Sequence, residues 1–396
     1  MKFALDEDQR SISDLLQRFV QEHYEYSKRR RLVAAEPGYS PQHWQRFTDL
    51  GLLGLSLPAE SGGLNLDFTY TALVMEWLGR GLVVEPYFSS VVLAGGVLKY
   101  APHGPRRSDC LAALCEGTLL LALAHEESGS EGRVQQIATR ARAQAGGYVV
   151  SGTKQLVLHG PSADRFVVSA CKDGSLLLFL LDARQAGIEL TPYRTVDGLP
   201  ACDLILREVT VERAQVLAEG ESAQAILRDV VTEAIAALCA EAVGCMQALF
   251  DITLDYVKQR KQFGRALGSF QVIQHRLADC FVDLEQSRSM ALLAANSVAA
   301  GAVDRHRSVA AAKAFIGEAS LRMGHEAIQL HGGMGMTEEL SVGGYHKRLL
   351  VIQSVFGDVD QQIERFNQFD DSAPIAALQK QSLAADANAS RSTAVE

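Results

Sequence analysis

The chain has 396 residues, of which 47% are apolar and 21% are charged, and its formal net charge is −9. This length and apolar content suffice for a large buried core and predict two or three domains. The charge pattern argues against nucleic-acid binding, because phosphate contacts need clustered Lys and Arg side chains. The one short basic run, Lys28-Arg29-Arg30-Arg31, predicts a solvated helix face, with a contact to an acidic partner as the alternative.

The seven cysteines form no CxxC pair and sit mostly among apolar neighbours, which predicts reduced thiols in a cytoplasmic protein. The segment from Met1 to Asp8 lacks a basic stretch followed by an apolar one, so we expect no signal peptide. We also expect no membrane-spanning helix, because no run of about 18 uncharged apolar residues occurs.

The first domain, residues 1–119, is predicted to be helical. Apolar residues recur at helical spacing over 8–23, 68–80, 89–100 and 109–116. A further short helix is predicted over 41–52, where Ser40 and Pro41 form a typical N-cap and first-turn pair.

A β-rich domain is predicted over residues 120–220. Short runs at 119–123, 148–151, 166–170, 176–181 and 204–211 are separated by Gly, Asp and Ser, which is typical of a small β-barrel or sandwich. Helical periodicity returns over 221–368 and predicts a four-helix bundle. Residues 369–396, rich in Ala, Ser and Gln, are predicted to be a flexible tail. The fold class is therefore α+β multidomain.

Two sequence blocks in the predicted bundle carry the most information. The first runs from Arg260-Lys261-Gln262-Phe263-Gly264 through Gly268-Ser269-Phe270-Gln271 to His275-Arg276-Leu277-Ala278-Asp279. The second is Gln329-Leu330-His331-Gly332-Gly333-Met334-Gly335-Met336-Thr337. Together they resemble the two C-terminal signatures of the acyl-CoA dehydrogenase flavoproteins. The likeness extends over about residues 5 to 367 and implies an N-terminal helical domain, a middle β-barrel and a C-terminal four-helix bundle.

The residue types of these blocks suit a flavin dinucleotide. Arg260 offers a planar donor fork for phosphate oxygens, Phe263 can pack on a ring, and Gly332-Gly333 permits a close backbone approach. The resemblance implies that FAD of a neighbouring subunit is bound by Arg260, Gln262, Phe263, Gln271, Gln329, Gly332 and Gly333. His275 and His331 lack metal-ligand spacing, so no metal site is expected.

The chain departs from the family pattern around the flavin ring and at the catalytic base. His125-Glu126-Glu127-Ser128 stands where Thr-Glu-Pro-Gly is common, and Leu156-Val157-Leu158-His159 stands where Trp-Ile-Thr is common. Asp358 occupies the place of a phosphate-side Thr, and Phe356 that of the usual catalytic glutamate.

A base is still needed, because the reaction removes the proton α to a thioester. Glu241 is the candidate, since it is the charged member of a helical face otherwise made of small residues (Ala234, Ala237, Cys245 and Ala248). A family branch that lacks the usual glutamate carries a similar Ala-Glu-x-x-Gly element. The alternative for Glu241 is an ion pair at a helix interface. Glu233 is the backup, and Asp358 is a poorer substitute.

The resemblance, closest to the small subunit of pimeloyl-CoA dehydrogenase and to the heteromeric sterol-type branch, implies an FAD-dependent acyl-CoA dehydrogenase. Such an enzyme would form a trans-2-enoyl-CoA and pass electrons to an electron-transfer flavoprotein. It also implies a homo- or heterotetramer and an acyl chain of dicarboxylic or steroid type. The alternatives are a non-catalytic partner subunit, an acyl-CoA oxidase, or a flavoenzyme of this fold acting on a substrate without CoA.

Overall fold

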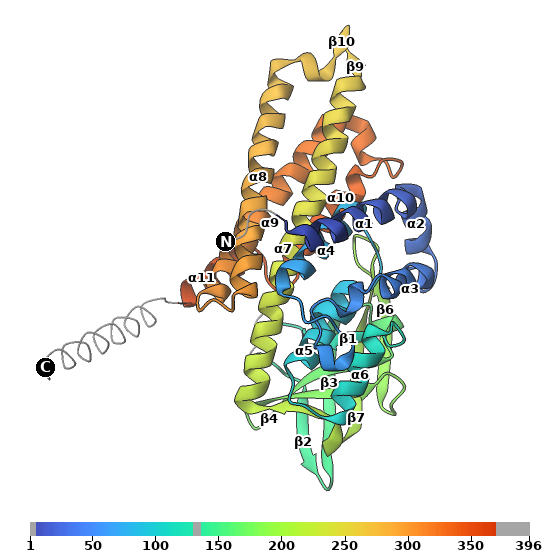
Figure 1. Cartoon of the computed structure of the whole chain (residues 1–396), viewed down its shortest axis with the longest axis vertical. Helices are drawn as coiled ribbons and strands as arrows, with labels where there is room; N and C mark the ends of the chain where they lie inside the picture. Colours follow the sequence, from blue (N-terminus) through green and yellow to red (C-terminus); the bar gives the residue numbers. More distant parts are fainter. Residues whose placement is uncertain (1–4, 130–135, 370–396) are drawn as a thin grey trace, which may run out of the picture.

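The computed structural model describes residues 5–129 and 136–369, so the predicted tail falls almost entirely outside the described residues. The chain begins with a helical layer (Figure 1). Its helices are α1 (Glu7–His23), α2 (Tyr26–Ala34), α3 (Pro41–Asp49), α4 (Phe68–Gly81), α5 (Gly95–Tyr100) and α6 (Pro105–Cys115), and a π-helical segment, η3, covers Phe88–Ala94. The predicted cap of α3 is confirmed, because the Ser40 hydroxyl accepts a bond from His43 N at 3.2 Å and Pro41 opens the helix.

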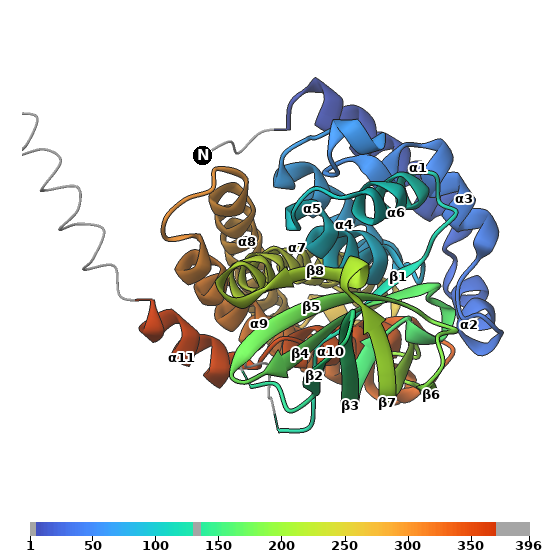
Figure 2. The ribbon, with the colours of Figure 1, turned by 90° about the horizontal axis from the view of Figure 1, so that it is seen from below.

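The middle of the chain forms a mixed sheet. Its strands are β1 (Leu121–Ala124), β2 (Arg140–Gln144), β3 (Gly147–Leu158), β4 (Arg165–Lys172), β5 (Ser175–Asp182), β6 (Ile188–Arg194), β7 (Pro200–Glu212) and β8 (Val216–Glu219). Neighbours run β6-β7-β3-β2-β4-β5-β8, and β1 pairs with β4 in parallel. Figure 2 shows the N-terminal helices packed beside this sheet.

The structure does not show the sheet closed into the predicted barrel. Among the described residues the terminal strands β6 and β8 do not pair with each other, so the sheet stays open. β8 has only four residues before the chain turns at Gly220 into the next helix. Packing of that helix near β5 and β8 covers this end of the sheet, which is one way that an edge is protected without closure.

The C-terminal part is a helical bundle, as predicted. It comprises α7 (Gly220–Gln259), α8 (Gln271–Ala299), α9 (Arg305–His331), α10 (Val342–Ser354) and the shorter α11 (Val359–Gln368). A two-stranded ribbon, β9 (Lys261–Gln262) and β10 (Arg265–Ala266), joins α7 to α8 at the far pole of the bundle (Figure 1). We call this pole, with the adjoining end of α9, the ribbon pole.

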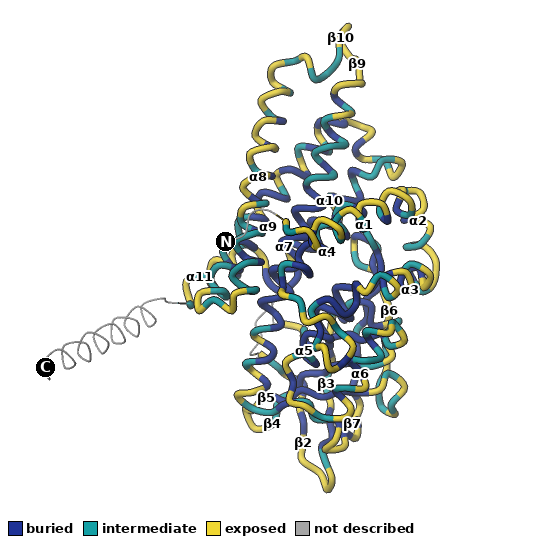
Figure 3. Tube along the Cα trace, viewed as in Figure 1, coloured by how far each residue is buried: buried dark blue, intermediate teal, exposed yellow. Residues whose placement is uncertain are grey.

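Helix α7 is the axis of the molecule. By length and composition it could cross a membrane, but 72% of its most apolar window is buried inside the chain, which is the burial of a core helix (Figure 3). Its small residues serve close packing against α4. A Cβ at Gly244 would lie 1.9 Å from Glu76 O, and one at Gly79 would lie 2.1 Å from Glu241 O. The two backbones therefore touch where the sequence suggested a face beside a ligand.

Candidate active site

Two cavities meet where the sheet faces α10 and α11. The first, about 400 Å³, is lined by the end of β1 and the following residues 125–129, by residues 155, 156 and 158 of β3, and by the α10–α11 loop. We call it the sheet cavity. The second, about 740 Å³, lies between α7, the β4–β5 hairpin and α11, and we call it the α11 cavity. Phe356 and Gln361 line both, and we call this shared wall the junction.

The loop that carries Phe356 is held through its backbone. Lys313 Nζ, buried on α9, donates to the carbonyls of Ile352, Gln353 (3.2 Å) and Val355 (3.3 Å). Gln362 Nε2 donates to Phe356 O at 2.7 Å and to Gly357 O at 3.3 Å. Burial lowers the pKa of Lys313 to about 8.

Phe356 itself has a φ of +58°, a left-handed conformation that is uncommon for a bulky residue. Its ring meets Phe88 edge-on at a centroid distance of 6.5 Å, and only 7% of the residue is exposed. Such conformations persist where the surroundings enforce them, and they cluster at functional sites. An apolar ring therefore occupies the position that the backbone presents to both cavities, and it cannot take up a proton.

Asp358 is engaged with its own helix. Its carboxylate accepts from Gln361 N at 3.0 Å, and Gln361 Oε1 accepts from Asp358 N at 2.9 Å, which makes a capping box at the start of α11. The acid therefore sits where the α11 amides could otherwise face a phosphate.

The predicted base Glu241 is buried in an ion pair. Arg348 on α10 donates from Nε to Glu241 Oε1 at 2.6 Å and from Nη2 to Oε2 at 2.8 Å. A third donor, Arg348 Nη1, lies 2.8 Å from Asp197 Oδ2. Glu241 lines neither cavity, and about 13 Å of helix separates it from Thr232, which lines the α11 cavity. These contacts favour the ion-pair interpretation that the sequence left open.

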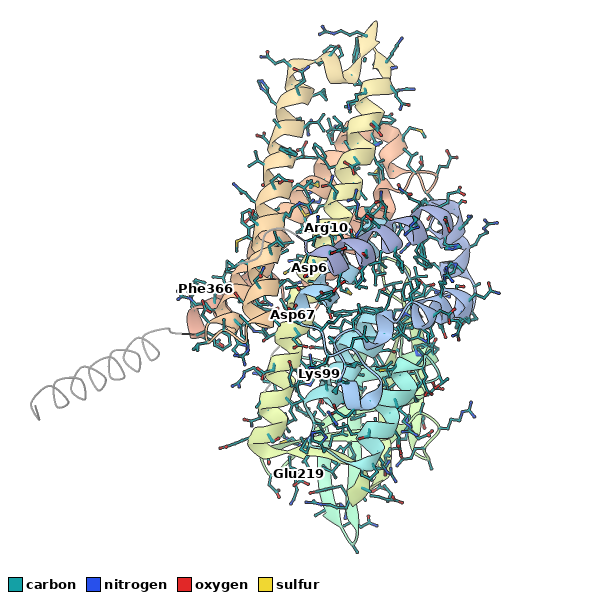
Figure 4. The ribbon with its side chains drawn as sticks, in the orientation of Figure 1. Asp6, Arg10, Asp67, Lys99, Glu219 and Phe366 are labelled. Atoms are coloured by element: carbon teal, nitrogen blue, oxygen red, sulfur yellow. The ribbon has the colours of Figure 1, made fainter. Side chains whose placement is uncertain are left out.

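The backup residue Glu233 is also paired. Its carboxylate accepts from Lys99 Nζ at 2.8 and 3.0 Å and from the Tyr100 hydroxyl (Lys99 is labelled in Figure 4). The cavity beside it measures about 10 Å³, which is at the lower limit for one water molecule. This cavity, the one that Glu233 lines, is too small for an acyl group.

The predicted dinucleotide residues gather at the ribbon pole. Arg260, Gln262 and Phe263 follow α7, Gln271 opens α8, and Gln329, Gly332 and Gly333 end α9. All are exposed, in keeping with the exposed tip of the ribbon pole in Figure 3. Phe263 is 90% exposed. Tyr256 joins the two blocks, because its ring stacks on His331 at 4.2 Å and its hydroxyl donates to His331 O at 3.3 Å.

The structure does not bring this pole to the cavities of the same chain. The 28 helix positions from Thr232 to Arg260 span about 42 Å (Figure 1). That is far beyond the reach of one bound dinucleotide, so a ligand held by both regions would have to lie between two copies or two related chains.

A buried polar cluster lies behind the sheet cavity, which its members His125 and Glu127 line, and the sequence analysis missed it. Lys154 Nζ on β3 donates to Glu127 Oε1 at 2.5 Å, to Ser169 Oγ at 3.0 Å and to His125 O at 3.3 Å. His125 Nδ1 lies 2.9 Å from Ser169 Oγ. Burial lowers the pKa of Lys154 to about 8 and that of His125 to about 3. A Lys at an inward position of a strand was the available signal.

Comparison with known proteins shows the family of the chain. Models of the acyl-CoA dehydrogenase N-terminal, middle and C-terminal domains match residues 6–118, 121–209 and 211–368. Mitochondrial isovaleryl-CoA dehydrogenase of Oryza sativa subsp. japonica is 32% identical over 76% of this chain and 76% of its own length. Acyl-CoA dehydrogenase FadE27 of Mycobacterium tuberculosis is 27% identical over 93% of this chain and 98% of its own. The ChsE4-ChsE5 complex from Mycobacterium tuberculosis is similar in structure, with a TM-score of 0.85, 26% identity, and 93% and 98% coverage. The chain therefore belongs to the acyl-CoA dehydrogenase family.

Members of this family are oxidoreductases that use FAD, and the residues present fit that cofactor. The sheet cavity has apolar walls from Leu123, Leu156 and Leu158 for a flat ring, and His125 supplies a polar edge. At the ribbon pole Arg260 supplies a charged donor for phosphate oxygens. The capping carboxylate of Asp358 gives no help to a pyrophosphate.

Proposed function

We propose that the chain is a subunit of an FAD-dependent acyl-CoA dehydrogenase that forms a trans-2-enoyl-CoA from an acyl-CoA thioester. The observation that carries the proposal is the meeting of the two cavities at Phe356. The flavin ring would occupy the sheet cavity, and the thioester would reach it through the α11 cavity. FAD, when bound, supplies the acceptor for the hydride that leaves the β carbon.

The α11 cavity suits a CoA chain. Arg228 and Arg365 bring positive charge to its wall, and Gln224, Gln361 and Gln368 bring amides. Arginine forks match phosphate oxygens, and amides match the peptide-like bonds of the pantetheine arm. The apolar ring of Phe356 would exclude water from the reacting carbons.

We further propose that a second subunit, identical or related, completes the site with its ribbon pole. The separation of about 42 Å along α7 supports this, as do the exposed Phe263 and Arg260. Electron-transfer flavoprotein is the proposed acceptor and the cytoplasm the proposed location. A steroid-type or dicarboxylic acyl chain is the proposed substrate class, supported by the likeness to the ChsE4-ChsE5 complex and to the solved structure of a steroid ACAD variant.

A second candidate function has its own support. The chain would be a non-catalytic partner that completes a related subunit's flavin site with its ribbon pole. Phe356 replaces the base, and Glu241, Glu233 and Asp358 are each engaged in an ion pair or a cap. A catalytic carboxylate needs a free place beside the substrate carbon. Glu241 and Glu233 line neither cavity, and Asp358, which lines the sheet cavity, is held by the cap of α11.

One purification decides between the two. The chain is expressed alone and together with any related subunit encoded beside it, and flavin absorbance and acyl-CoA-dependent dye reduction are measured on both. Flavin and turnover in the chain alone support the first candidate. Flavin and turnover that appear only with the related subunit, and that survive Glu241→Gln in this chain, support the second. A colourless, inactive assembly contradicts both.

A further inference from the structure

The buried cluster behind the sheet cavity fixes the state of one histidine. The parallel pairing of β1 with β4 aligns Ala124 with Val168, so the next residues, His125 and Ser169, lie side by side. Both are buried, at 4% and 0% exposure, and Lys154 of β3 is fully buried beneath them. All three groups are shielded from water, so each of their protons needs an acceptor within the cluster.

The protons can be assigned one by one. A lysine ammonium only donates, and the three donors of Lys154 have three acceptors, namely Glu127 Oε1, Ser169 Oγ and His125 O. Glu127 is held in turn by Thr139, whose N donates at 3.1 Å and whose hydroxyl donates at 2.6 Å. The ammonium therefore has no proton left for another group.

Ser169 Oγ accepts a hydrogen bond from Lys154 Nζ, so the Ser169 hydroxyl must donate its own hydrogen bond to another group. The acceptor at hydrogen-bond distance among the described residues is His125 Nδ1, at 2.9 Å. If Nδ1 carried a proton instead, the Ser169 hydroxyl hydrogen would face a donor in a dry site. A neutral imidazole has one N–H, so the proton of His125 belongs on Nε2. Burial, with the nearby Lys154 charge, holds the pKa of His125 at about 3, so the ring is neutral at physiological pH.

The other edge of the ring faces the sheet cavity. His125 contributes to the cavity wall beside Leu123 and Gln155, and its Nδ1 edge is turned inward to Ser169. The Nε2 edge, on the opposite side of the ring, is therefore the one available to a ligand.

We propose that the Lys154–Ser169–His125 relay makes His125 a fixed Nε2–H donor to the polar edge of the flavin ring, where it raises the flavin's midpoint potential. This rests on the proposed placement of the ring in the sheet cavity. A neutral donor with a locked tautomer recognises a carbonyl oxygen or an unprotonated ring nitrogen, whereas a protonated ring nitrogen would oppose it as a second donor. Reduction adds negative charge to that edge, so the bond strengthens in the reduced state.

The first measurement needs no flavin. Solid-state ¹⁵N spectra of histidine-labelled protein, wild type and His125→Gln, give the two ring nitrogens of His125 by difference. We expect an unprotonated Nδ1 and a protonated Nε2. Ser169→Ala removes the donor to Nδ1, so we expect mixed tautomers. A protonated Nδ1 in the wild type overturns the proposal.

The second measurement uses the assembly loaded with FAD. His125→Leu should lower affinity for the reduced relative to the oxidised flavin by about tenfold, which is about 30 mV in a two-electron potential. His125→Gln keeps an N–H donor and should recover most of the shift. His346→Leu, on α10 and outside both cavities, is the matched control and should leave the potential unchanged.

The outcomes separate the two proposals. Wild-type protein that binds FAD, with the same potential in His125→Leu, overturns the role of His125 and leaves the proposed function standing. Wild-type assembly that takes up no FAD, with any related subunit supplied, overturns the proposed function and with it the ligand contact of His125. A shift in His125→Leu that His125→Gln reverses supports both.

Discussion

Removing the charge of Arg348 should destabilise the protein more than removing the charge of any other residue named so far. Its guanidinium holds two buried carboxylates at once, Glu241 on α7 and Asp197 in the β6–β7 loop, and both residues are 5% exposed. Arg348→Met leaves both without their cation. Breaking one buried pair costs about 3–5 kcal/mol, so the loss should reach at least that range. Glu241→Gln keeps an acceptor for Arg348 Nε and should cost about 1–3 kcal/mol.

The assay is urea unfolding at a fixed protein concentration, because assembly adds to apparent stability. Arg30→Met is the matched control. Arg30 also pairs with a carboxylate, Glu338 at 2.9 Å, but the two side chains are 47% and 73% exposed. An exposed pair contributes about 0–1 kcal/mol, so this variant should unfold almost as the wild type does.

The pH dependence gives a second reading of the same network. Burial alone would raise the pKa of Asp197. The charge of Arg348, with hydrogen bonds from Arg348, Thr195 and the Leu199 amide, nevertheless holds this pKa below its usual value. The stability from this carboxylate is therefore present above the unfolded pKa, about 3.9, and is lost as pH falls through the lower folded value.

Equal stability losses in Arg348→Met and Arg30→Met would refute the ion-pair interpretation. One outcome for Glu241→Gln would instead support Glu241 as the catalytic base. If Glu241→Gln retained its flavin and most of its stability while turnover fell by about 10²–10⁴, the carboxylate would be acting on a proton.

The other predictions concern the junction, the ribbon pole and acid stability. Phe356→Glu should raise acyl-CoA turnover in a dye assay by about 10²–10⁴, and an equal rise in Phe356→Gln would contradict a base at this position. Arg260→Ala should weaken FAD retention on dialysis by about 1.5–3 kcal/mol, whereas exposed Lys258→Ala should not; equal losses would refute a specific phosphate contact. Burial lowers the pKa of His159 to about 4 from an unfolded 6.5, so stability should fall by about 2 kcal/mol between pH 7 and 5 on its account. His159→Gln should not show this loss of stability. If the variant and the wild type lost the same stability between pH 7 and 5 in urea unfolding, the prediction would be contradicted.

Much of the helical fold could be predicted because local signals and packing agree. Ser40 and Pro41 begin α3 as expected, and the apolar period of α1 and α4 matches their buried residues. Helix α2 was predicted only as a solvated helix face around the basic run, and its bounds were not predicted. Arg29 in that run is buried and donates to Leu82 O and Asp197 O, whereas the neighbouring basic residues are exposed as predicted. Whether a sheet closes into a barrel depends on pairing between strands far apart in the sequence. Closure could therefore not be predicted from short β-rich runs.

The candidate site was only partly predictable. The two blocks at the ribbon pole could be recognised from the sequence because each is a continuous run of characteristic residues. The stripe around Glu241 was ambiguous, since small residues suit a ligand cavity and a close helix crossing equally, and only the position of α4 decides between them. Lys154 and Ser169 meet His125 through strand pairing, which no single-sequence period specifies.

The loop around Phe356 has a consequence for how such chains diverge. Lys313 and Gln362 grip it through carbonyl oxygens, which every amino acid possesses, and none of these bonds involves the aromatic ring. These backbone bonds can therefore form whichever side chain stands at position 356. A gene duplicate could exchange an inert side chain for an acidic one, or the reverse, without refolding the turn. Active and silent copies of one ancestor could in this way remain interchangeable as building blocks.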